Sequence, residues 1–407
     1  MRVKSAIAAT AALALLSVAA PAAAATPYRP ATPVARTSAA GTSAAGTSAA
    51  GASTAASDHE ATRQAVRDLL RTGTPGALAY ARDADGPWFT SSGTAERGTL
   101  RAPAVGDRFR VGSITKIFTA TAVVQLAAQG RLRLDDTVEK WLPGLVTGNG
   151  NDGRRITVRQ LLNHTSGLFD YTEDADLART HLYGEGFLRN RFDRFTPQQV
   201  IKIALAHPPY HSPGQGWHYS NTNYALAGLI IEKASGRSYA DQIRRTIINP
   251  LRLTSTTVPG TATGLPAPHL HGYSKLGETA PSARIYDVTE MSPTIPGAGG
   301  QIISTAPDLA RFIAHLMNGT LVPQSYLKQM RTTVPLIPHL SYGLGLFERK
   351  LPCGRTIWGH GGQIQGYLSY TAATADGSHA ATVALNSDWA DPSQLDGVLD
   401  KEFCPGG

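Results

Sequence analysis

Two residues able to do acyl-transfer chemistry, Ser113 and Lys116, lie three positions apart between the strand-like run 107–112 and the apolar run 117–126. On a helix, positions i and i+3 share a face, so the hydroxyl and the amine can meet about one turn apart. A serine is a poor nucleophile at neutral pH unless a neighbouring group takes its proton. The segment is therefore predicted to hold a serine nucleophile together with its proton acceptor.

The same spacing recurs at Ser325 and Lys328, so spacing alone does not identify the site. That second pair follows Val322-Pro323 in a polar stretch and predicts an exposed helix start. The first pair differs because Gly112 permits a tight turn into a helix that is apolar enough to be buried. A serine there lies at a helix N-terminus, where backbone N–H groups and the helix dipole favour developing negative charge.

A phenol and a carboxamide follow in Tyr219-Ser220-Asn221, on a loop that leads into an apolar helix from Ala225. A tyrosine hydroxyl can relay a proton, and an asparagine amide can hold a substrate carbonyl. The triplet is common, and read alone it is better explained as a helix-capping loop.

A third group, His360-Gly361-Gly362 followed by Gln363, comes after a strand-like run. Paired glycines let a backbone approach a ligand closely, as an oxyanion hole or a substrate-binding edge strand requires. Read alone, the group also fits a glycine-rich turn with an incidental histidine.

Predicted strands lie at both ends of the globular region, and mainly helices and loops lie between them, which indicates an α+β fold. The strand patterns cover 78–82, 88–92, 341–350, 355–359, 365–373 and 379–386. The helical patterns cover 59–71, 157–162, 196–206, 224–234, 239–248 and 390–402. Residues 58–407 are predicted to form one domain, with an α/β part at about 58–115 and 290–407 and a helical part at about 116–289.

The N-terminal residues read as a targeting segment. Residues 1–25 combine Arg2 and Lys4, an alanine-rich apolar stretch and small residues, as a secretory signal peptide does, and the stretch is too short for a membrane anchor. The unit Gly-Thr-Ser-Ala-Ala repeats within 26–57, where no large apolar side chain could drive folding. We expect a secreted protein with a low-complexity linker or leader at 26–57.

Charge and cysteine content agree with export. The formal net charge is +8, and removal of Arg2 and Lys4 with the signal peptide would leave +6. The remaining positive charges form no basic block, so nucleic acid is not an expected partner. In an oxidising compartment, Cys353 and Cys404 are predicted to form a disulfide, which would tie the C-terminal helix to a strand, rather than remain two free thiols.

Other chemistries find little support. His269 and His271 would share one strand face, but no third zinc ligand lies near them in the sequence. The glycine pairs are too short to cradle phosphates, and there is no G-x-S-x-G elbow of an α/β-hydrolase. We expect no metal, no cofactor and no stable membrane insertion.

The three groups, in this order, resemble those of the penicillin-recognising serine hydrolases, which include serine DD-peptidases, class C β-lactamases and their esterase and aminopeptidase relatives. The resemblance extends over essentially all residues after 58 and looks closest to the D-alanyl-D-alanine carboxypeptidases that actinomycetes secrete. It implies an antiparallel sheet flanked by helices with an inserted, mainly helical subdomain. The strings that carry it are Asp-Arg-Phe-Arg-Val-Gly-Ser at 107–113, Leu-Leu-Asn-His-Thr-Ser-Gly-Leu at 161–168, Tyr-Ser-Asn-Thr-Asn at 219–223, Gly-Gly-Gln-Ile-Ile-Ser-Thr at 299–305, Tyr-Gly-Leu-Gly-Leu at 342–346 and Gln-Gly-Tyr at 365–367.

The resemblance assigns the chemistry. Ser113 would form an acyl-enzyme that water hydrolyses, and Lys116 and Tyr219 would share the proton transfers. A lysine base would need its pKa far below the usual value of about 10.4.

The resemblance also assigns substrate contacts. Asn221 would hold the substrate amide, and His360 would complete the polar wall. The backbone N–H groups of Ser113 and of Gln363, beyond Gly361-Gly362, would form the oxyanion hole.

The pattern departs from that of the carboxypeptidases where they bind the substrate carboxylate. Two threonines and an arginine are replaced by Gly361, Gln363 and Phe347, and Arg349 or Arg355 is left to substitute. We expect a secreted D-alanyl-D-alanine carboxypeptidase acting on peptidoglycan-type peptides. A β-lactamase, an esterase or a D-amino-acid peptidase or amidase with the same machinery stays open, as does a non-catalytic penicillin-binding module. The expected partner is a small peptide, ester or β-lactam, and the expected state is a monomer.

Overall fold

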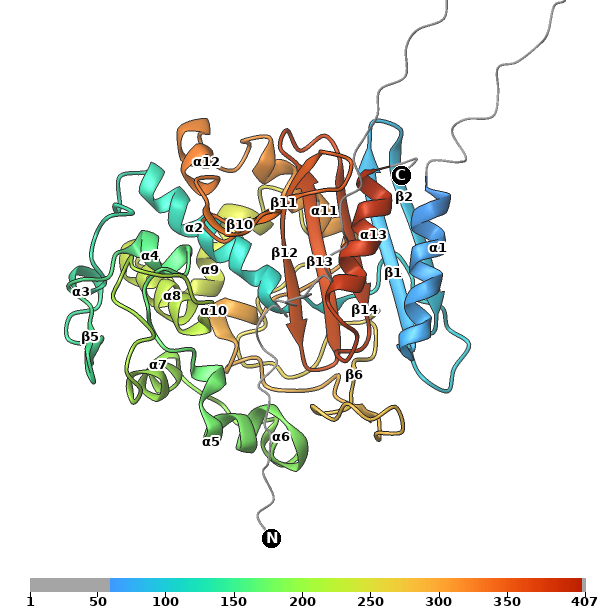
Figure 1. The fold of residues 1–407 in the computed structure, drawn as a ribbon, viewed down its shortest axis with the longest axis horizontal. Helices are drawn as coiled ribbons and strands as arrows, with labels where there is room; N and C mark the ends of the chain where they lie inside the picture. The colour runs from blue at the N-terminus through green and yellow to red at the C-terminus, as the bar shows by residue number, and fades with distance from the viewer. Residues whose placement is uncertain (1–58, 405–407) are drawn as a thin grey trace, which may run out of the picture. The chain divides into compact units, whose positions relative to one another are not determined.

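The computed structural model describes residues 59–404, so the predicted signal peptide and linker lie outside the described residues. Its centre is an eight-stranded sheet in the order β2-β1-β14-β13-β12-β11-β10-β9 (Figure 1). Every neighbouring pair is antiparallel, and β1 pairs with β14 from the far end of the chain. The predicted α+β class, with one antiparallel sheet built from both ends of the chain, is confirmed. The strands of this sheet are β1 (Gly76–Asp83), β2 (Gly86–Gly93), β9 (Val334–Ile337), β10 (Leu340–Tyr342), β11 (Phe347–Lys350), β12 (Thr356–Ile364), β13 (Tyr367–Thr374) and β14 (Ala380–Leu385).

Three short two-stranded ribbons complete the strand pairing in the described part of the chain. They are β3 (Phe109–Arg110) with β8 (Ile303–Ser304), β4 (Thr147–Gly148) with β5 (Asn151–Asp152), and β6 (Tyr273–Ser274) with β7 (Tyr286–Asp287).

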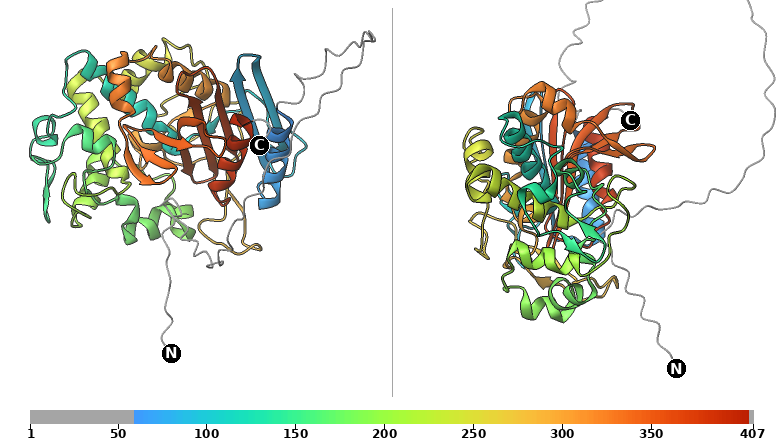
Figure 2. Two further views of the ribbon diagram at one scale, coloured as in Figure 1. Left: turned by 45° about the horizontal axis from the view of Figure 1, so that its top comes forward. Right: turned by 90° about the vertical axis from the view of Figure 1, so that its left-hand side faces the viewer.

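Helices cover both sides of the sheet. α1 (Glu60–Leu69) and α13 (Ser393–Phe403) pack against each other and form one hydrophobic cluster with strand residues. The mainly helical part, from α3 to α9, gathers beside the sheet (Figures 1 and 2). The remaining helices are α2 (Thr115–Ala128), α3 (Val138–Trp141), α4 (Val158–Leu162), α5 (Ala175–Leu177), α6 (Gly184–Asn190), α7 (Pro197–Leu205), α8 (Asn221–Ser235), α9 (Tyr239–Ile243), α10 (Gly297–Gly300), α11 (Ala306–Met317) and α12 (Gln324–Met330).

The central helix is α2, in which every residue from Thr115 to Ala127 is buried. A helix that is buried all round belongs to the interior of a protein and not to its surface. Phe118 of α2 stacks on Phe312 of α11 with ring centroids 3.7 Å apart, which fixes α2 against the helix that contacts β13 and β14. The sequence predicted this burial from the apolar run 117–126.

The structure corrects three predicted element bounds. The predicted strand 341–350 is two strands, because the chain turns at Gly345, where φ is +75° and an added Cβ would lie 2.6 Å from the Ala120 Cβ of α2. The predicted strand ending at 359 continues to Ile364, so the His-Gly-Gly group lies within β12 and not in a turn. The predicted helix 224–234 begins at Asn221.

A disulfide joins Cys353 to Cys404 with Cα atoms 5.9 Å apart. Cys353 lies between β11 and β12, so the bond ties the end of α13 to a turn and not, as expected, to a strand. None of the helices within 59–404 is long and apolar enough to cross a bilayer.

Replacing both cysteines by serine should lower the free energy of unfolding by about 2–4 kcal/mol, because a cross-link between residues 51 positions apart restricts the unfolded chain. The change in unfolding midpoint in urea, with and without reductant, measures this. The serine variant should be insensitive to reductant, and its kcat should match that of the oxidised wild type. Equal stability of the two proteins would contradict the prediction.

Candidate active site

The structure brings Ser113 and Lys116 into direct contact at the start of α2. A short 3-10 turn, η2 (Gly112–Ile114), leads into the helix, and the Lys116 Nζ lies 3.0 Å from the Ser113 Oγ. Lys116 has no exposed surface, whereas Ser113 is partly exposed. The serine can therefore reach a substrate while its amine partner is kept from water.

Two further acceptors surround the Lys116 Nζ. It donates to the Asn221 Oδ1 at 2.7 Å, at the start of α8, and to the Gly299 carbonyl at 2.9 Å, in α10. An ammonium group has three N–H donors, and with Ser113 each of them has a partner. Burial nevertheless lowers the pKa of Lys116 to about 7, and the charge of Asp170 opposes this change. The amine is therefore uncharged in an appreciable fraction of molecules at neutral pH, as a general base must be.

The third predicted catalytic residue, Tyr219, lies against the same amine, with the centre of its ring 4.9 Å from the Lys116 Nζ. The same ring lies against that of His164, tilted by 32°, with 4.3 Å between the ring centroids. Burial raises the pKa of Tyr219 well above its usual value, although a hydrogen bond with the Ser113 side chain acts in the opposite direction. The phenol therefore stays protonated at neutral pH, which suits a proton donor or relay better than a phenolate base.

His360 is buried, and both of its ring nitrogens have partners within the protein. The Nδ1 faces the Gly361 carbonyl at 2.5 Å, so it carries the proton and donates, and the Nε2 accepts from the Tyr342 hydroxyl at 3.1 Å. Burial and the nearby Lys116 lower the pKa of His360 to about 3, so the ring is neutral. In this arrangement the neutral imidazole holds the Tyr342 hydroxyl and the Gly361 carbonyl in place beside the predicted site.

Glycines let β12 come against η2. Gly112 has φ +52°, and an added Cβ would lie 2.8 Å from the Gln363 carbonyl oxygen. A Cβ at Gly362 would lie 1.9 Å from the Val111 oxygen. At Gly361 the nearest atom would be 3.4 Å away, an ordinary contact, so only the first two positions require glycine for the approach.

As a result, the backbone of η2 at Gly112, next to Ser113, lies against the backbone of Gln363, as the predicted two-donor oxyanion hole needs. The Gln363 side chain is exposed and donates to the Asp388 carbonyl at 2.9 Å.

Sequence reasoning missed the buried residues whose hydrogen bonds hold Asn221 and its neighbours in place. Asp170, which is 1% exposed, accepts from the Asn221 Nδ2 at 2.9 Å, and the Thr172 hydroxyl lies 3.4 Å from the same nitrogen. The His164 Nδ1 accepts from the Ser220 N–H and from the Asn223 Nδ2, both at 3.1 Å. The string 161–168 contributed to the family resemblance, but no spacing in it assigns such a role to His164, and Asp170 lies beyond its end.

The predicted substitutes for a carboxylate-binding arginine point elsewhere. Arg349 forms ion pairs with Asp396 and Asp400 of α13, and the Arg355 Nη1 donates to the Phe403 carbonyl at 2.9 Å. The sequence left this role open for both arginines, because strand alternation does not reveal which neighbouring element covers each side chain.

The wall beside His360 is instead aromatic. The Phe347 ring lies 4.9 Å from the His360 ring and 4.5 Å from the Tyr342 ring, measured between centroids. Leu340, Tyr342 and Phe347 form a separate buried cluster, against which Trp217 and part of β9 pack.

Two other sequence features carry no chemistry in the structure. Ser325 and Lys328 are both exposed on α12, as expected. The rings of His269 and His271 lie 5.2 Å apart, but no group of three His, Cys, Asp or Glu suited to a metal ion occurs within 59–404.

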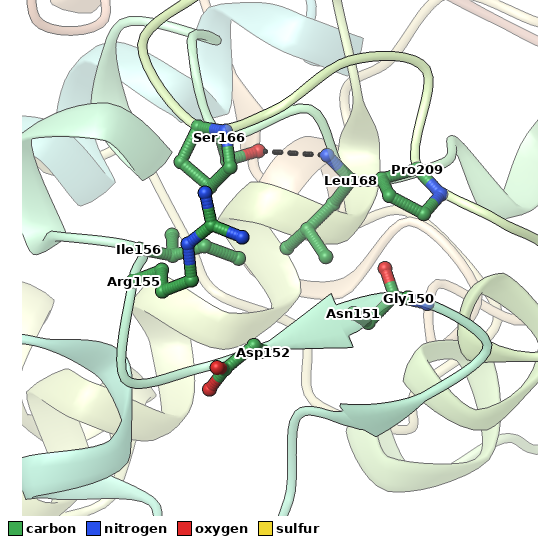
Figure 3. A pocket seen from close by; sticks show the side chains of 9 residues that line it. Gly150, Asn151, Asp152, Arg155, Ile156, Ser166, Leu168 and Pro209 are labelled. Atoms are coloured by element: carbon green, nitrogen blue, oxygen red, sulfur yellow. Dashed lines mark hydrogen bonds between the residues drawn. The ribbon is translucent and has the colours of Figure 1, made fainter.

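A small pocket of the helical part is separate from the predicted site residues (Figure 3). The Ser166 hydroxyl there donates to the Asn223 Oδ1 at 2.6 Å and accepts from the Leu168 N–H at 3.1 Å, so it is not free to act as a nucleophile. The lining residues are Gly150, Asn151, Asp152, Arg155, Ile156, Ser166, Leu168, Pro209 and Pro213.

A large antiparallel sheet beside a helical part, with a buried lysine next to a serine at the start of the central helix, defines a serine hydrolase of the penicillin-recognising kind. Residues 62–400 match the β-lactamase family, and the chain belongs to that family.

Among curated proteins, the chain is 34% identical over 258 residues to penicillin-binding protein 4 of Amycolatopsis lactamdurans, covering 62% of each chain. It is 36% identical over 186 residues to penicillin-binding protein 4* of Bacillus subtilis, covering 45% of this chain and 38% of that protein. The chain thus matches less than two thirds of the length of these relatives.

Solved structures match over more of their length. A D-stereospecific amidohydrolase from a Streptomyces species is 49% identical with a TM-score of 0.80, covering 86% of this chain and all of that one. The D-amino acid amidase of Ochrobactrum anthropi SV3, solved with L-phenylalanine, is 26% identical with a TM-score of 0.71, covering 84% and 97%.

Replacing Ser113 by alanine should lower turnover of any hydrolysed substrate by at least about 10³-fold, because the attacking oxygen is lost. The matched control is Ser325→Ala, which removes a hydroxyl with the same spacing to a lysine and should keep wild-type kcat. Steady-state kinetics and covalent labelling by a fluorescent penicillin measure both. Wild-type rates in Ser113→Ala would refute the assignment of the nucleophile.

The pH dependence of kcat/KM should show an acid limb with a midpoint near 7, because Lys116 can accept the serine proton only when it is uncharged. Activity falls as the pH drops through that value. Asp388, whose pKa burial raises to about 6, is the other group near Gln363 that titrates close to this range. The variant Asp388→Asn should therefore keep the midpoint of the acid limb. If the acid limb disappeared in this variant, the limb would have to be assigned to Asp388 and not to Lys116.

Proposed function

We propose that this protein hydrolyses small D-configured amides, peptides and esters through an acyl-enzyme on Ser113, as a D-stereospecific amidohydrolase. The observation that carries this proposal is the aromatic wall beside His360, where Phe347 stands in place of a carboxylate-binding cation. A terminal carboxylate buried there without a partner would be destabilised, whereas an uncharged amide or ester would not. The likeness to the Streptomyces amidohydrolase, at 49% identity, supports the same substrate class.

In the proposed acylation, the Ser113 Oγ attacks the substrate carbonyl carbon, and its proton passes to the uncharged Lys116 amine. The carbonyl oxygen takes up negative charge between the N–H groups of Ser113 and Gln363. Such donors contribute roughly 3–4 kcal/mol each in comparable enzymes. The contact of 3.0 Å between Oγ and Nζ supports direct proton transfer.

Breakdown of the tetrahedral intermediate needs a proton on the leaving group. Tyr219 is a protonated phenol that contacts both Ser113 and Lys116, so it can donate to the departing nitrogen or oxygen and regain a proton from Lys116. Water then adds to the acyl-serine ester, gives a proton to the same base, and releases the acid while the serine hydroxyl re-forms.

A D-alanyl-D-alanine carboxypeptidase is the second candidate. The motif strings and the likeness to penicillin-binding proteins favour it. Against it stands the absence of the expected substitutes, because Arg349 and Arg355 contact the α13 region.

We also propose that the protein is exported. The Cys353–Cys404 disulfide is compatible with an oxidising compartment. The monomeric state stays a prediction.

The test is a panel of D- and L-phenylalanine amide, a diacylated peptide ending in D-Ala-D-Ala, and a chromogenic cephalosporin, with Ser113→Ala as the inactive control. We expect kcat/KM for the D-amide to exceed that for the L-amide by about 10²-fold or more, because discrimination by a shaped pocket reaches this range. Faster release of D-alanine from the peptide than of ammonia from the D-amide would make the carboxypeptidase the function instead.

A matched pair of variants tests the role of the wall. Phe347→Arg should shift the ratio of the two rates toward the peptide, because a guanidinium can pair with its terminal carboxylate. Phe347→Leu keeps the wall apolar and should leave the ratio near that of the wild type.

A further inference from the structure

The Asn221 side chain, predicted to bind substrate, is engaged by the protein at every polar position. Its Oδ1 accepts from the Lys116 Nζ at 2.7 Å, and its Nδ2 lies 2.9 Å from the Asp170 Oδ2 and 3.4 Å from the Thr172 Oγ1. The carboxamide therefore bridges a buried carboxylate and the amine that contacts the nucleophile. Only the longer contact, to Thr172, could be given up to a substrate at little cost.

We propose that Asp170 is a positioning residue for acylation, whose carboxylate holds the Asn221 amide so that the lone pair of the uncharged Lys116 amine points at the Ser113 hydroxyl. This inference deepens the proposed function: it rests on Lys116 acting as the base and not on the class of substrate.

The first step is the orientation of the amide. A carboxylate has acceptors only. The Asp170 Oδ1 accepts from the Thr172 N–H at 3.0 Å, and the Oδ2 faces Asn221, which must present its N–H there. The Asn221 oxygen consequently faces the amine.

The second step is the orientation of the lysine. An uncharged amine has two N–H donors and one lone pair, and Lys116 has three neighbours. The oxygens of Asn221 and Gly299 can only accept, so they take the two N–H groups, and the lone pair is left for the Ser113 O–H. If the amide were reversed, its N–H would compete for that lone pair, and the amine would be a poorer base.

The loop that carries Asp170 is fixed on both sides. The Asp170 N–H donates to the Tyr210 hydroxyl at 3.1 Å, and that hydroxyl donates to the Glu173 Oε2 at 2.7 Å. The next residue, Tyr171, donates its N–H to the Thr222 hydroxyl of α8 at 3.2 Å. The loop that carries the Asp170 carboxylate is thus fixed against α8, the helix that begins with Asn221.

The charge of Asp170 adds a second, measurable effect. Among the described groups around Lys116, His164 and His360 are neutral because burial lowers their pKa values. Tyr219 and Tyr224 are protonated because burial raises theirs. Asp170 is the carboxyl group among them, and its negative charge raises the pKa of Lys116.

Lys116 is the cation whose charge acts on Asp170. Burial raises the pKa of Asp170, while hydrogen bonds from Thr172 and Asn221 and the charge of Lys116 oppose the rise. The phenols that sense its charge, Tyr171, Tyr183, Tyr210 and Tyr219, all have raised pKa values and stay protonated.

The first test needs no substrate. In protein labelled with ¹³Cε-lysine, the Lys116 signal is assigned by its loss in Lys116→Arg and titrated with pH. The midpoint should lie near 7 in the wild type and about one unit lower in Asp170→Asn, because a stabilising negative charge is removed. An unchanged midpoint in Asp170→Asn would overturn the proposal.

The second test is kinetic and uses a p-nitrophenyl ester and the best amide substrate. Asp170→Ala should lower kcat about 10²-fold at the optimum pH with little change in KM, because the base is misdirected while substrate contacts remain. Asp170→Asn should recover part of the rate, because its oxygen can still accept from Asn221. The matched control, Asp174→Asn, removes a nearby carboxylate that pairs with His207 and should keep the wild-type pH profile.

A double-mutant cycle separates positioning from general loss of structure. Because Asp170 is inferred to act through Asn221, Asp170→Ala should cost little further rate in an Asn221→Ala background. Full additivity of the two losses, in variants with wild-type circular dichroism, would refute the mechanism even if the D-amidase activity is established. Conversely, if the protein does not prefer the D-amide in the substrate panel, the ester kinetics and the Lys116 titration still test the role of Asp170.

Discussion

The structure depends on one constraint, the complete burial of the Lys116 amine. Keeping a charged ammonium in such a place is costly, and a decrease in pKa from 10.5 to about 7 corresponds to roughly 5 kcal/mol of lost preference for the charged form. The protein offsets part of this cost with acceptors from Ser113, Asn221 and Gly299. These lie on η2, α8 and α10, so the base forms only when three elements distant in sequence have packed together. The same burial that costs stability leaves an appreciable fraction of the amine uncharged at neutral pH, as a general base must be.

A second constraint follows from the first, because the nucleophile must reach solvent from a helix whose interior is sealed. Ser113 is at the edge of the buried segment, on the turn that precedes α2, and β12 comes against this turn with no side chains between the two backbones. Gly112 and Gly362 are the positions at which a Cβ would collide with the opposite backbone. The absence of side chains thereby brings the two backbones together, as the predicted pair of N–H donors requires, and no polar residue in the sequence encodes this approach.

Much of this arrangement could be predicted from the sequence, and the reasons for success and failure differ from residue to residue. Ser113 and Lys116 were recognisable because their contact is local, fixed by helix geometry and by the apolar run that follows. Tyr219 and His360 were found only through a family resemblance, since each triplet alone has an ordinary explanation. Asp170 was missed because its partner, Asn221, is 51 positions away and the contact depends on how a loop crosses the start of α8.

The role of Arg349 stayed open for the same reason, because its partners on α13 are set by packing and not by alternation.

The catalytic group and the aromatic wall beside His360 come from different parts of the fold. The first is held by buried hydrogen bonds among α2, α8, α10 and the loop at 170, whereas the wall is formed by Phe347, Tyr342 and neighbouring apolar side chains of β9–β11. His360 links the two, since its Nε2 accepts from Tyr342 while its ring lies beside Tyr219. Under the proposed function, changes on β9–β11 would alter the bond that is cleaved without disturbing the amine. That separation would let one acyl-transfer centre be retained while the charge of its substrate changes.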